Sequence, residues 1–118
     1  MNRLLAALAS AVLVSLAACH SHHIDITIEN RTGGAIELLE IDYPSASFGA
    51  NNLAAGAEMH YRIQVRGSGA LKMQFTGPAG NQVAIDGPDL AEDQEGRLEI
   101  DLLPAGKAEF HPELTPGK

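Results

Sequence analysis

The 118-residue chain has one cysteine, no tryptophan and only eight lysines and arginines, against fifteen aspartates and glutamates. A single cysteine excludes an intramolecular disulfide, so the packing of the core must hold the fold together. Nucleic-acid-binding proteins neutralise phosphate with clustered basic residues, and here these residues are few and scattered. The formal net charge of −7 also disfavours attraction to anionic lipid. We therefore expect no nucleic-acid binding, and any membrane attachment must be hydrophobic or covalent.

The chain begins with a secretory signal. A short basic start that includes Arg3 precedes the apolar stretch 4–16, "LLAALASAVLVSL". That stretch has the length of the hydrophobic region of a signal peptide and is shorter than the ~20 residues needed to span a bilayer. The pattern predicts a signal-peptide helix over residues 1–18, which is removed from the mature protein.

The end of this segment carries a recognisable motif. Leu16-Ala17-Ala18-Cys19 resembles the lipobox of bacterial lipoproteins, in which a branched apolar residue and two small residues precede the modified cysteine. The resemblance implies cleavage after Ala18, a diacylglyceryl thioether on Cys19 and an acyl chain such as palmitate on the new α-amine. Aspartate directly after the cysteine often marks retention in the inner membrane, and this chain has His20 there. The resemblance therefore favours the outer membrane, with the domain facing the periplasm or the cell surface.

From residue 24 onward, apolar and polar residues alternate with a period of two, which is typical of half-buried strands. About seven such segments are joined by glycine-rich and proline-rich turns, and no long helical pattern occurs. The sequence predicts an all-β domain over 24–111, a small antiparallel β-sandwich of immunoglobulin-like architecture. Residues 19–23 are expected to form a lipidated, histidine-rich tether, and 112–118 a disordered tail.

The pattern also predicts details of individual strands. In the strand at 36–43, Ile36 and Leu38 are expected to point inward, and a change of phase predicts a β-bulge near Leu38 and Leu39. The segment 45–57 is expected to be a long loop with at most a short strand at 47–50. The segments 58–66 and 70–77 form the clearest predicted hairpin, with Met59, Tyr61, Ile63 and Val65 inward in the first of them. The segment 87–96 interrupts the alternation and suggests one helical turn.

Cysteine and histidine beside each other raise the possibility of a metal site made by Cys19, His20, His22 and His23. A lipidated Cys19 is a thioether rather than a thiolate, and imidazoles on a tether lack the surrounding groups that orient metal ligands. A polar spacer is the simpler interpretation. We expect no resident metal and no cofactor other than the covalent lipid.

An acidic segment offers a second candidate. It contains Asp86, Asp89, Glu92, Asp93 and Glu95. Calcium takes several carboxylate and carbonyl oxygens, but this spacing does not match an EF-hand loop. A solvated acidic loop is the favoured interpretation, with calcium binding as the alternative.

No catalytic motif is present. His60 and His111 fall on the polar sides of their strands, and Ser45, Ser47 and Ser68 lie in loops without a nucleophile-elbow sequence. Tyr43 and Phe48 either form a recognition surface or close one end of the sandwich.

The sequence therefore favours a non-enzymatic envelope lipoprotein whose sandwich domain binds another envelope protein or has a structural role. No small-molecule substrate is indicated. The alternative is a periplasmic module that binds or senses a metal ion through the histidine-rich tether or the acidic loop 86–95.

Overall fold

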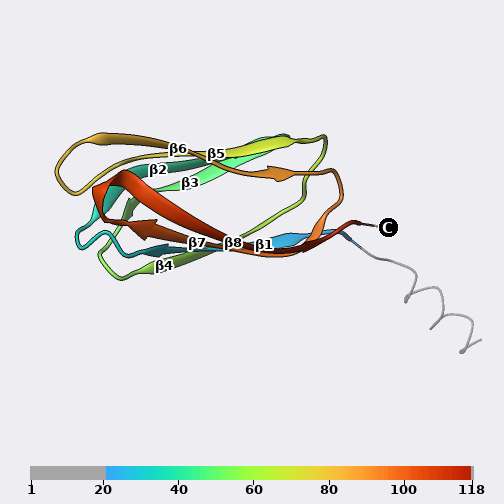
Figure 1. Ribbon diagram of the computed structural model, residues 1–118, viewed down its shortest axis with the longest axis horizontal. Helices are drawn as coiled ribbons and strands as arrows, with labels where there is room; N and C mark the ends of the chain where they lie inside the picture. Colours follow the sequence, from blue (N-terminus) through green and yellow to red (C-terminus); the bar gives the residue numbers. More distant parts are fainter. Residues whose placement is uncertain (1–20, 118) are drawn as a thin grey trace, which may run out of the picture.

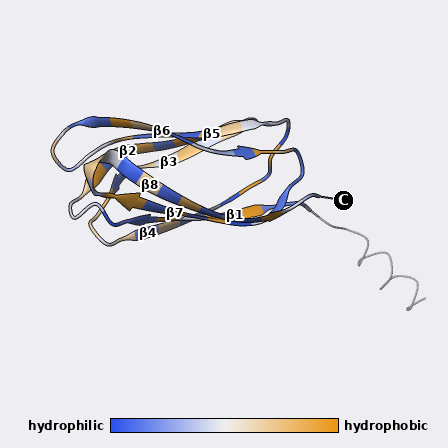
Figure 2. Ribbon diagram, viewed as in Figure 1, coloured by the Kyte–Doolittle hydropathy of each residue, from blue (hydrophilic) through white to orange (hydrophobic). Residues whose placement is uncertain are grey.

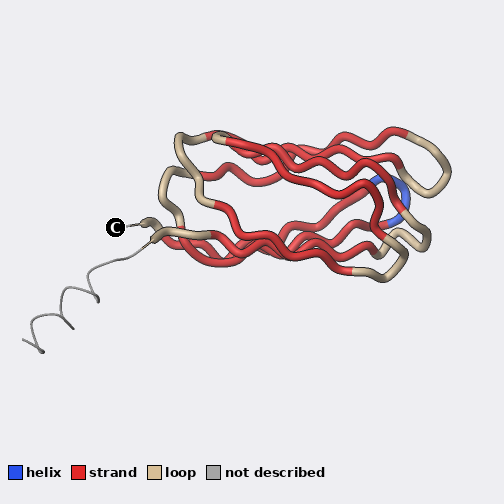
Figure 3. The backbone as a smooth tube through the Cα atoms, turned by 180° about the vertical axis from the view of Figure 1, so that it is seen from behind, coloured by secondary structure: helices blue, strands red, loops and turns tan. Residues whose placement is uncertain are grey.

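In the computed structural model, which describes residues 21–117, eight strands form two facing layers (Figures 1 and 3). The strands are β1 (Ile24–Asn30), β2 (Ile36–Tyr43), β3 (Ala46–Leu53), β4 (Glu58–Ile63), β5 (Gly69–Thr76), β6 (Gln82–Leu90), β7 (Glu95–Leu103) and β8 (Lys107–Thr115). A 3-10 turn, η1 (Pro104–Gly106), joins the last two strands. The predicted signal-peptide helix, Cys19 and His20 lie outside the described residues.

Each layer is a four-stranded sheet. One sheet has the order β4-β1-β7-β8 and the other the order β3-β2-β5-β6. The pair β1–β7 is parallel, whereas the other paired strands are antiparallel. The predicted all-β sandwich is confirmed, with eight strands in place of about seven and with one parallel pair in an otherwise antiparallel arrangement.

The core lies between the sheets and follows from the alternation. Apolar and polar segments succeed one another along the strands in Figure 2. In β1, Ile24, Ile26 and Ile28 are buried while the residues between them face outward. β8 packs only half-buried side chains, including Ala108 and Phe110, against this core. Burial of this apolar surface is the main favourable contribution to the free energy of folding. No disulfide within the domain adds to it.

The β-bulge is in β2, where the sequence predicts it. The register with β5 shifts between Glu37 and Glu40. Leu38 has a φ of 53° and is 63% exposed, whereas Leu39 is buried. The prediction that Leu38 points inward is therefore wrong: the extra residue turns outward in the left-handed conformation, and Leu39 takes the inner position.

The segment expected to be a long loop is largely strand. β3 spans eight residues and pairs with β2 along its length, with Phe48 and Leu53 facing the core. Its small polar residues conceal the alternation, because an edge strand needs few inward side chains. Gly49 lies opposite the bulge, and a Cβ atom there would be 1.9 Å from the carbonyl oxygen of Leu39. Only glycine fits this close approach.

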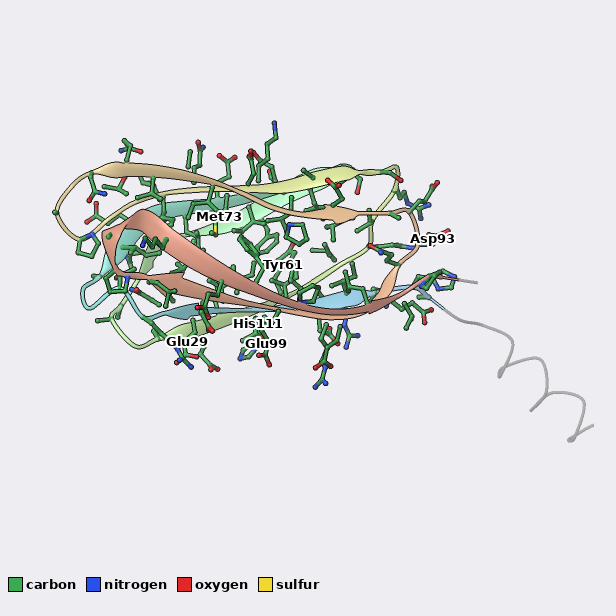
Figure 4. The ribbon with its side chains drawn as sticks, viewed as in Figure 1. Glu29, Tyr61, Met73, Asp93, Glu99 and His111 are labelled. Carbon is green, nitrogen blue, oxygen red and sulfur yellow. The ribbon has the colours of Figure 1, made fainter. Side chains whose placement is uncertain are left out.

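The predicted hairpin of 58–66 and 70–77 does not form. β4 pairs with β1 in one sheet, and β5 pairs with β2 and β6 in the other. Residues 64–68 cross between the sheets, with Val65 buried on the way. Tyr61 points inward as predicted (Figure 4) and stacks on Phe48, but it is 46% exposed because β4 is an edge strand whose side chains are covered from one side only.

Two further boundaries differ from the prediction. β6 continues to Leu90, so no helical turn interrupts it, and a short turn at 91–94 leads into β7. β8 continues to Thr115, which lies opposite Glu95, so 112–115 belong to the sheet and not to a disordered tail. Pro112 is tolerated there because β8 is an edge strand, and the backbone groups along its outer edge need no partner strand.

One buried polar side chain joins the two sheets. Asn30, at the end of β1, is fully buried. Its Nδ2 donates to the carbonyl oxygens of Gly34 (2.9 Å), Leu53 (2.9 Å) and Ala54 (3.1 Å), which lead into β2 and out of β3. Its Oδ1 accepts a hydrogen bond from the backbone N–H of Thr32 at 3.1 Å. The amide thus supplies a donor to the buried carbonyl group of Leu53 and to two part-buried carbonyl groups beside it.

We predict that Asn30→Ala destabilises the domain by about 3 kcal/mol, because the buried carbonyl group of Leu53 and two part-buried ones lose a donor at once. Chemical denaturation measures the change. Asn52→Ala, at an exposed position on β3, is the matched control and should change stability by less than about 0.5 kcal/mol. Equal losses in the two variants would contradict the role assigned to Asn30.

Substitutions at the two adjacent leucines of the bulge should have opposite effects on the stability of the domain. Leu38→Asn should stabilise the domain by about 1 kcal/mol, since asparagine adopts the left-handed conformation more readily and the lost side chain is exposed. Leu39→Ala should cost about 2–5 kcal/mol by leaving a cavity in the core. Thermal unfolding of both variants checks this, and a destabilised Leu38→Asn would show that the exposed leucine contributes packing that its exposure conceals.

Candidate functional site

The outer face of the sheet β4-β1-β7-β8 carries most of the ion pairs in the described part of the chain. Four strands contribute alternate side chains, which register in three rows across the sheet. Figure 4 shows Glu29, Glu99 and His111 on this outer side and Tyr61 on the inner side. We call the rows the arginine row (Arg62, Asp25, Arg97, Glu113), the histidine row (His60, Thr27, Glu99, His111) and the acidic row (Glu58, Glu29, Asp101, Glu109).

Charges in the arginine row are paired. Arg62 Nε donates to Asp25 Oδ1 at 2.8 Å, and an Arg97 guanidinium N–H donates to Glu113 Oε2 at 2.7 Å. The hydrogen bond and the charge of Glu113 raise the pKa of Arg97. Exposed pairs of this kind add little to stability, so this row is a solvated surface.

The acidic row places carboxylates directly opposite one another. Glu58 lies opposite Glu29, Glu29 opposite Asp101, and Asp101 opposite Glu109. Like charges at directly opposed positions destabilise a sheet. Arg31 offsets part of this repulsion, with its guanidinium 2.9 Å from Glu29 Oε2 and 3.7 Å from Asp101 Oδ1. The hydrogen bond to Glu29 and then the charges of Glu29 and Asp101 raise the pKa of Arg31.

A histidine stands beside the acidic row at each edge of the sheet. His60 Nε2 is 3.4 Å from Glu58 Oε2, on β4. On β8, His111 Nε2 is 3.4 Å from Asp101 Oδ2 and 3.5 Å from Glu109 Oε2. Both histidines are exposed, as the sequence predicts.

Asp101, Glu109 and His111 form the most concentrated set of metal-ligating atoms in this part of the chain. One nitrogen or oxygen atom from each side chain lies within 4.8 Å of the others. The Asp101 side chain is only 18% exposed, so the sheet holds it more firmly than the other two. Sequence alternation puts Glu109 and His111 on one face, but the turn at Pro104–Gly106 sets the register that brings Asp101 opposite Glu109 and diagonal to His111. That turn contains Ala105 at a φ of 64°, which the sequence pattern does not reveal.

The predicted histidine-rich tether is only partly described. His22 Nδ1 is paired with Glu95 Oε1, and the carbonyl oxygen of His23 accepts a hydrogen bond from Gly96 N–H at 3.1 Å. Both histidines are half-buried. In the described part, residues 22 and 23 therefore lie against the start of β7 and do not act as a free spacer.

The acidic segment 86–95 is spread over three elements. Asp86 and Asp89 lie in β6, with Asp86 opposite Lys72. Glu92 and Asp93 lie in the turn, and Asp93 is at the end of the sandwich (Figure 4). Within residues 21–117, the acids of this segment do not form a group of three with ligand atoms close enough to share an ion. The geometry gives the calcium hypothesis no support.

The remaining candidates have structural roles. Ser45 Oγ accepts a hydrogen bond from Arg66 N–H at 3.2 Å and donates to the carbonyl oxygen of Gln64 at 3.3 Å, which ties two turns together. The hydroxyl is thus engaged with backbone groups.

The aromatic residues close one side of the sandwich. Phe48, 8% exposed, stacks on Tyr61 with ring centroids 4.3 Å apart and an interplanar angle of 5°. Tyr43 lies 6.4 Å from Phe48, and burial and then the neighbouring Tyr61 raise the pKa of Tyr43. Phe48 is therefore a core residue that connects the edge strands β3 and β4, so it closes one side of the sandwich and not, as was the alternative from the sequence, one end.

Comparison with known proteins supports the fold and goes no further. Neither a scan against models of protein families nor a search of curated proteins found a match. A solved structure, the NMR structure of a protein from Eubacterium rectale, is similar over 82% of this chain and 92% of its own, with a TM-score of 0.55 and 12% identity. In the region that the structure describes, no helix has the length and apolar character needed to cross a bilayer.

Neutralising one carboxylate of the acidic row should stabilise the domain. Glu109→Gln removes one of two directly opposed carboxylates and should stabilise the domain by about 0.2–1 kcal/mol at low ionic strength. Glu113→Gln, on the same strand and face, removes a partner of Arg97 and should lower stability slightly. Urea denaturation of both variants measures the difference, and a destabilised Glu109→Gln would show that the carboxylates do not repel each other.

Proposed function

We propose that the protein is a lipid-anchored protein of the bacterial envelope whose β-sandwich serves in binding or structure and not in catalysis. The observation that carries the proposal is where the chain enters the fold. Ile24 begins β1 five residues after Cys19 of the lipobox-like motif, at the end of the sandwich where β8 also finishes (Figure 1). A lipid on Cys19 then holds the domain by one end.

This placement gives the sandwich a direction. Five residues span at most about 17 Å, so the turns at 44–45, 64–68 and 91–94 face the membrane at short range. The turns at the opposite end, which include η1, point away from it (Figure 3). The charged outer face of β4-β1-β7-β8 runs along the side and remains accessible to an envelope protein.

Covalent anchoring also fits the charge of the chain. A net charge of −7 gives no electrostatic attraction to anionic headgroups. Each buried methylene of an acyl chain contributes ~0.8 kcal/mol, and two or three chains make the attachment stable. His20 after Cys19 favours the outer membrane, with the domain facing the periplasm or the surface.

The anchor makes a direct prediction. Cys19→Ser should release the protein from the membrane fraction, because the acylated atom is lost, while the fold beyond residue 23 is unchanged. Membrane fractionation, with mass spectrometry of the N-terminal peptide, measures the result. The native protein should give a peptide that begins at acylated Cys19.

Two substitutions of the neighbouring residue, His20, serve as controls. His20→Ala should keep both the lipid and the outer-membrane location, whereas His20→Asp should keep the lipid and shift the protein to the inner membrane. A mature N-terminus at an unmodified residue other than Cys19 would refute the anchor.

A further inference from the structure

We propose that Asp101, Glu109 and His111 form a surface site for a divalent transition-metal ion of the zinc type. The site is separate from the tether and from the segment 86–95. The three side chains project from β7 and β8 onto the outer face, and Figure 4 shows His111 there beside Glu99.

The distances suit tetrahedral coordination. Two ligand atoms that each lie about 2.0–2.1 Å from zinc are about 3.4 Å apart at the tetrahedral angle. His111 Nε2 is 3.4 Å from Asp101 Oδ2 and 3.5 Å from Glu109 Oε2. These separations are long for a direct N–H···O hydrogen bond, which is usually 2.7–3.2 Å. The ligand atoms of Asp101 and Glu109 lie within 4.8 Å of each other, so the two carboxylates need only approach one another for the three atoms to share one ion.

The donor set selects the kind of metal. Imidazole suits zinc, copper and nickel, whereas calcium and magnesium prefer oxygen ligands throughout. Three protein ligands on an open face leave a fourth position for water or for a group on another molecule. Asp101 is held on its far side by Arg31, whose Nε is 3.7 Å from Asp101 Oδ1, and this contact limits the movement of the carboxylate.

The charges around these ligands also favour a cation. The arginine row, on the far side of the histidine row, pairs its charges, whereas the acidic row opposes carboxylate to carboxylate at three successive strand pairs. Arg31 contacts the two central members only. A divalent ion at the β8 edge neutralises Asp101 and Glu109, so binding removes a repulsion that the empty site retains.

Titration calorimetry and thermal unfolding of the purified full chain with zinc chloride test the site. We expect one zinc ion per chain at the site and a rise in the unfolding temperature. His111→Ala and Glu109→Gln should each weaken binding about 10–100-fold or more, since loss of a ligand is at least as costly as loss of its supporting contact. Glu109→Gln is expected to be more stable than the native chain without zinc, so a lost response is not a failure to fold.

Two controls distinguish this site from other histidines. His60→Ala alters the histidine at the opposite edge of the same face and should leave zinc affinity unchanged. The triple variant His20→Ala, His22→Ala and His23→Ala should retain the zinc-induced rise. No stoichiometric binding, equal losses in His60→Ala and His111→Ala, or a loss confined to the triple variant would overturn the proposal. The test does not depend on the lipid, so its failure leaves the anchored-domain proposal standing.

Discussion

The fold depends on the buried amide of Asn30. It ends β1 in one sheet and donates to carbonyl groups at the start of β2 and the end of β3 in the other. Its own backbone N–H donates to the carbonyl oxygen of Ala57, and its carbonyl accepts from Gly56 N–H. A buried polar group without partners is costly, so this set of bonds forms as a whole and sets how the sheets meet. It also fixes the orientation of the residues on either side, with Glu29 and Arg31 directed to the outer face.

The two faces of the sheet β4-β1-β7-β8 obey different constraints. The inner face is apolar and supplies the stability of a domain with no disulfide. The outer face carries an acidic row whose like charges oppose folding and, beyond the histidine row, an arginine row whose charges are paired. A stable domain tolerates such repulsion, and functional sites are where local charge conflicts are most often retained. The β8 edge of the acidic row is therefore a better candidate for a functional site than the turns at either end of the sandwich.

Much of the fold follows from the sequence, because alternation with period two reports which face of each strand is buried. It identifies β1, β5 and β7 and locates the bulge at Leu38 and Leu39. It fails at β3, whose small polar residues need little burial at a sheet edge. It also fails for β4 and β5, which neighbour each other in sequence but cross between the layers. The first failure is a strand without a recognisable pattern, and the second is a failure of pairing, which depends on contacts far apart in the chain.

By itself, the sequence determined the inward and outward faces of most strands and predicts a signal peptide that ends in a lipobox-like motif at Cys19, because each is encoded in neighbouring residues. For the candidate metal site, it indicated only that Glu109 and His111 share a face. The tertiary structure alone decided that Asp101 joins them and that Glu29 and Glu58 extend the row. The register of β7 with β8 depends on the η1 turn, and that of β7 with β1 on a parallel pairing between the two ends of the domain. No local pattern encodes either register, because each is selected by packing of the whole core.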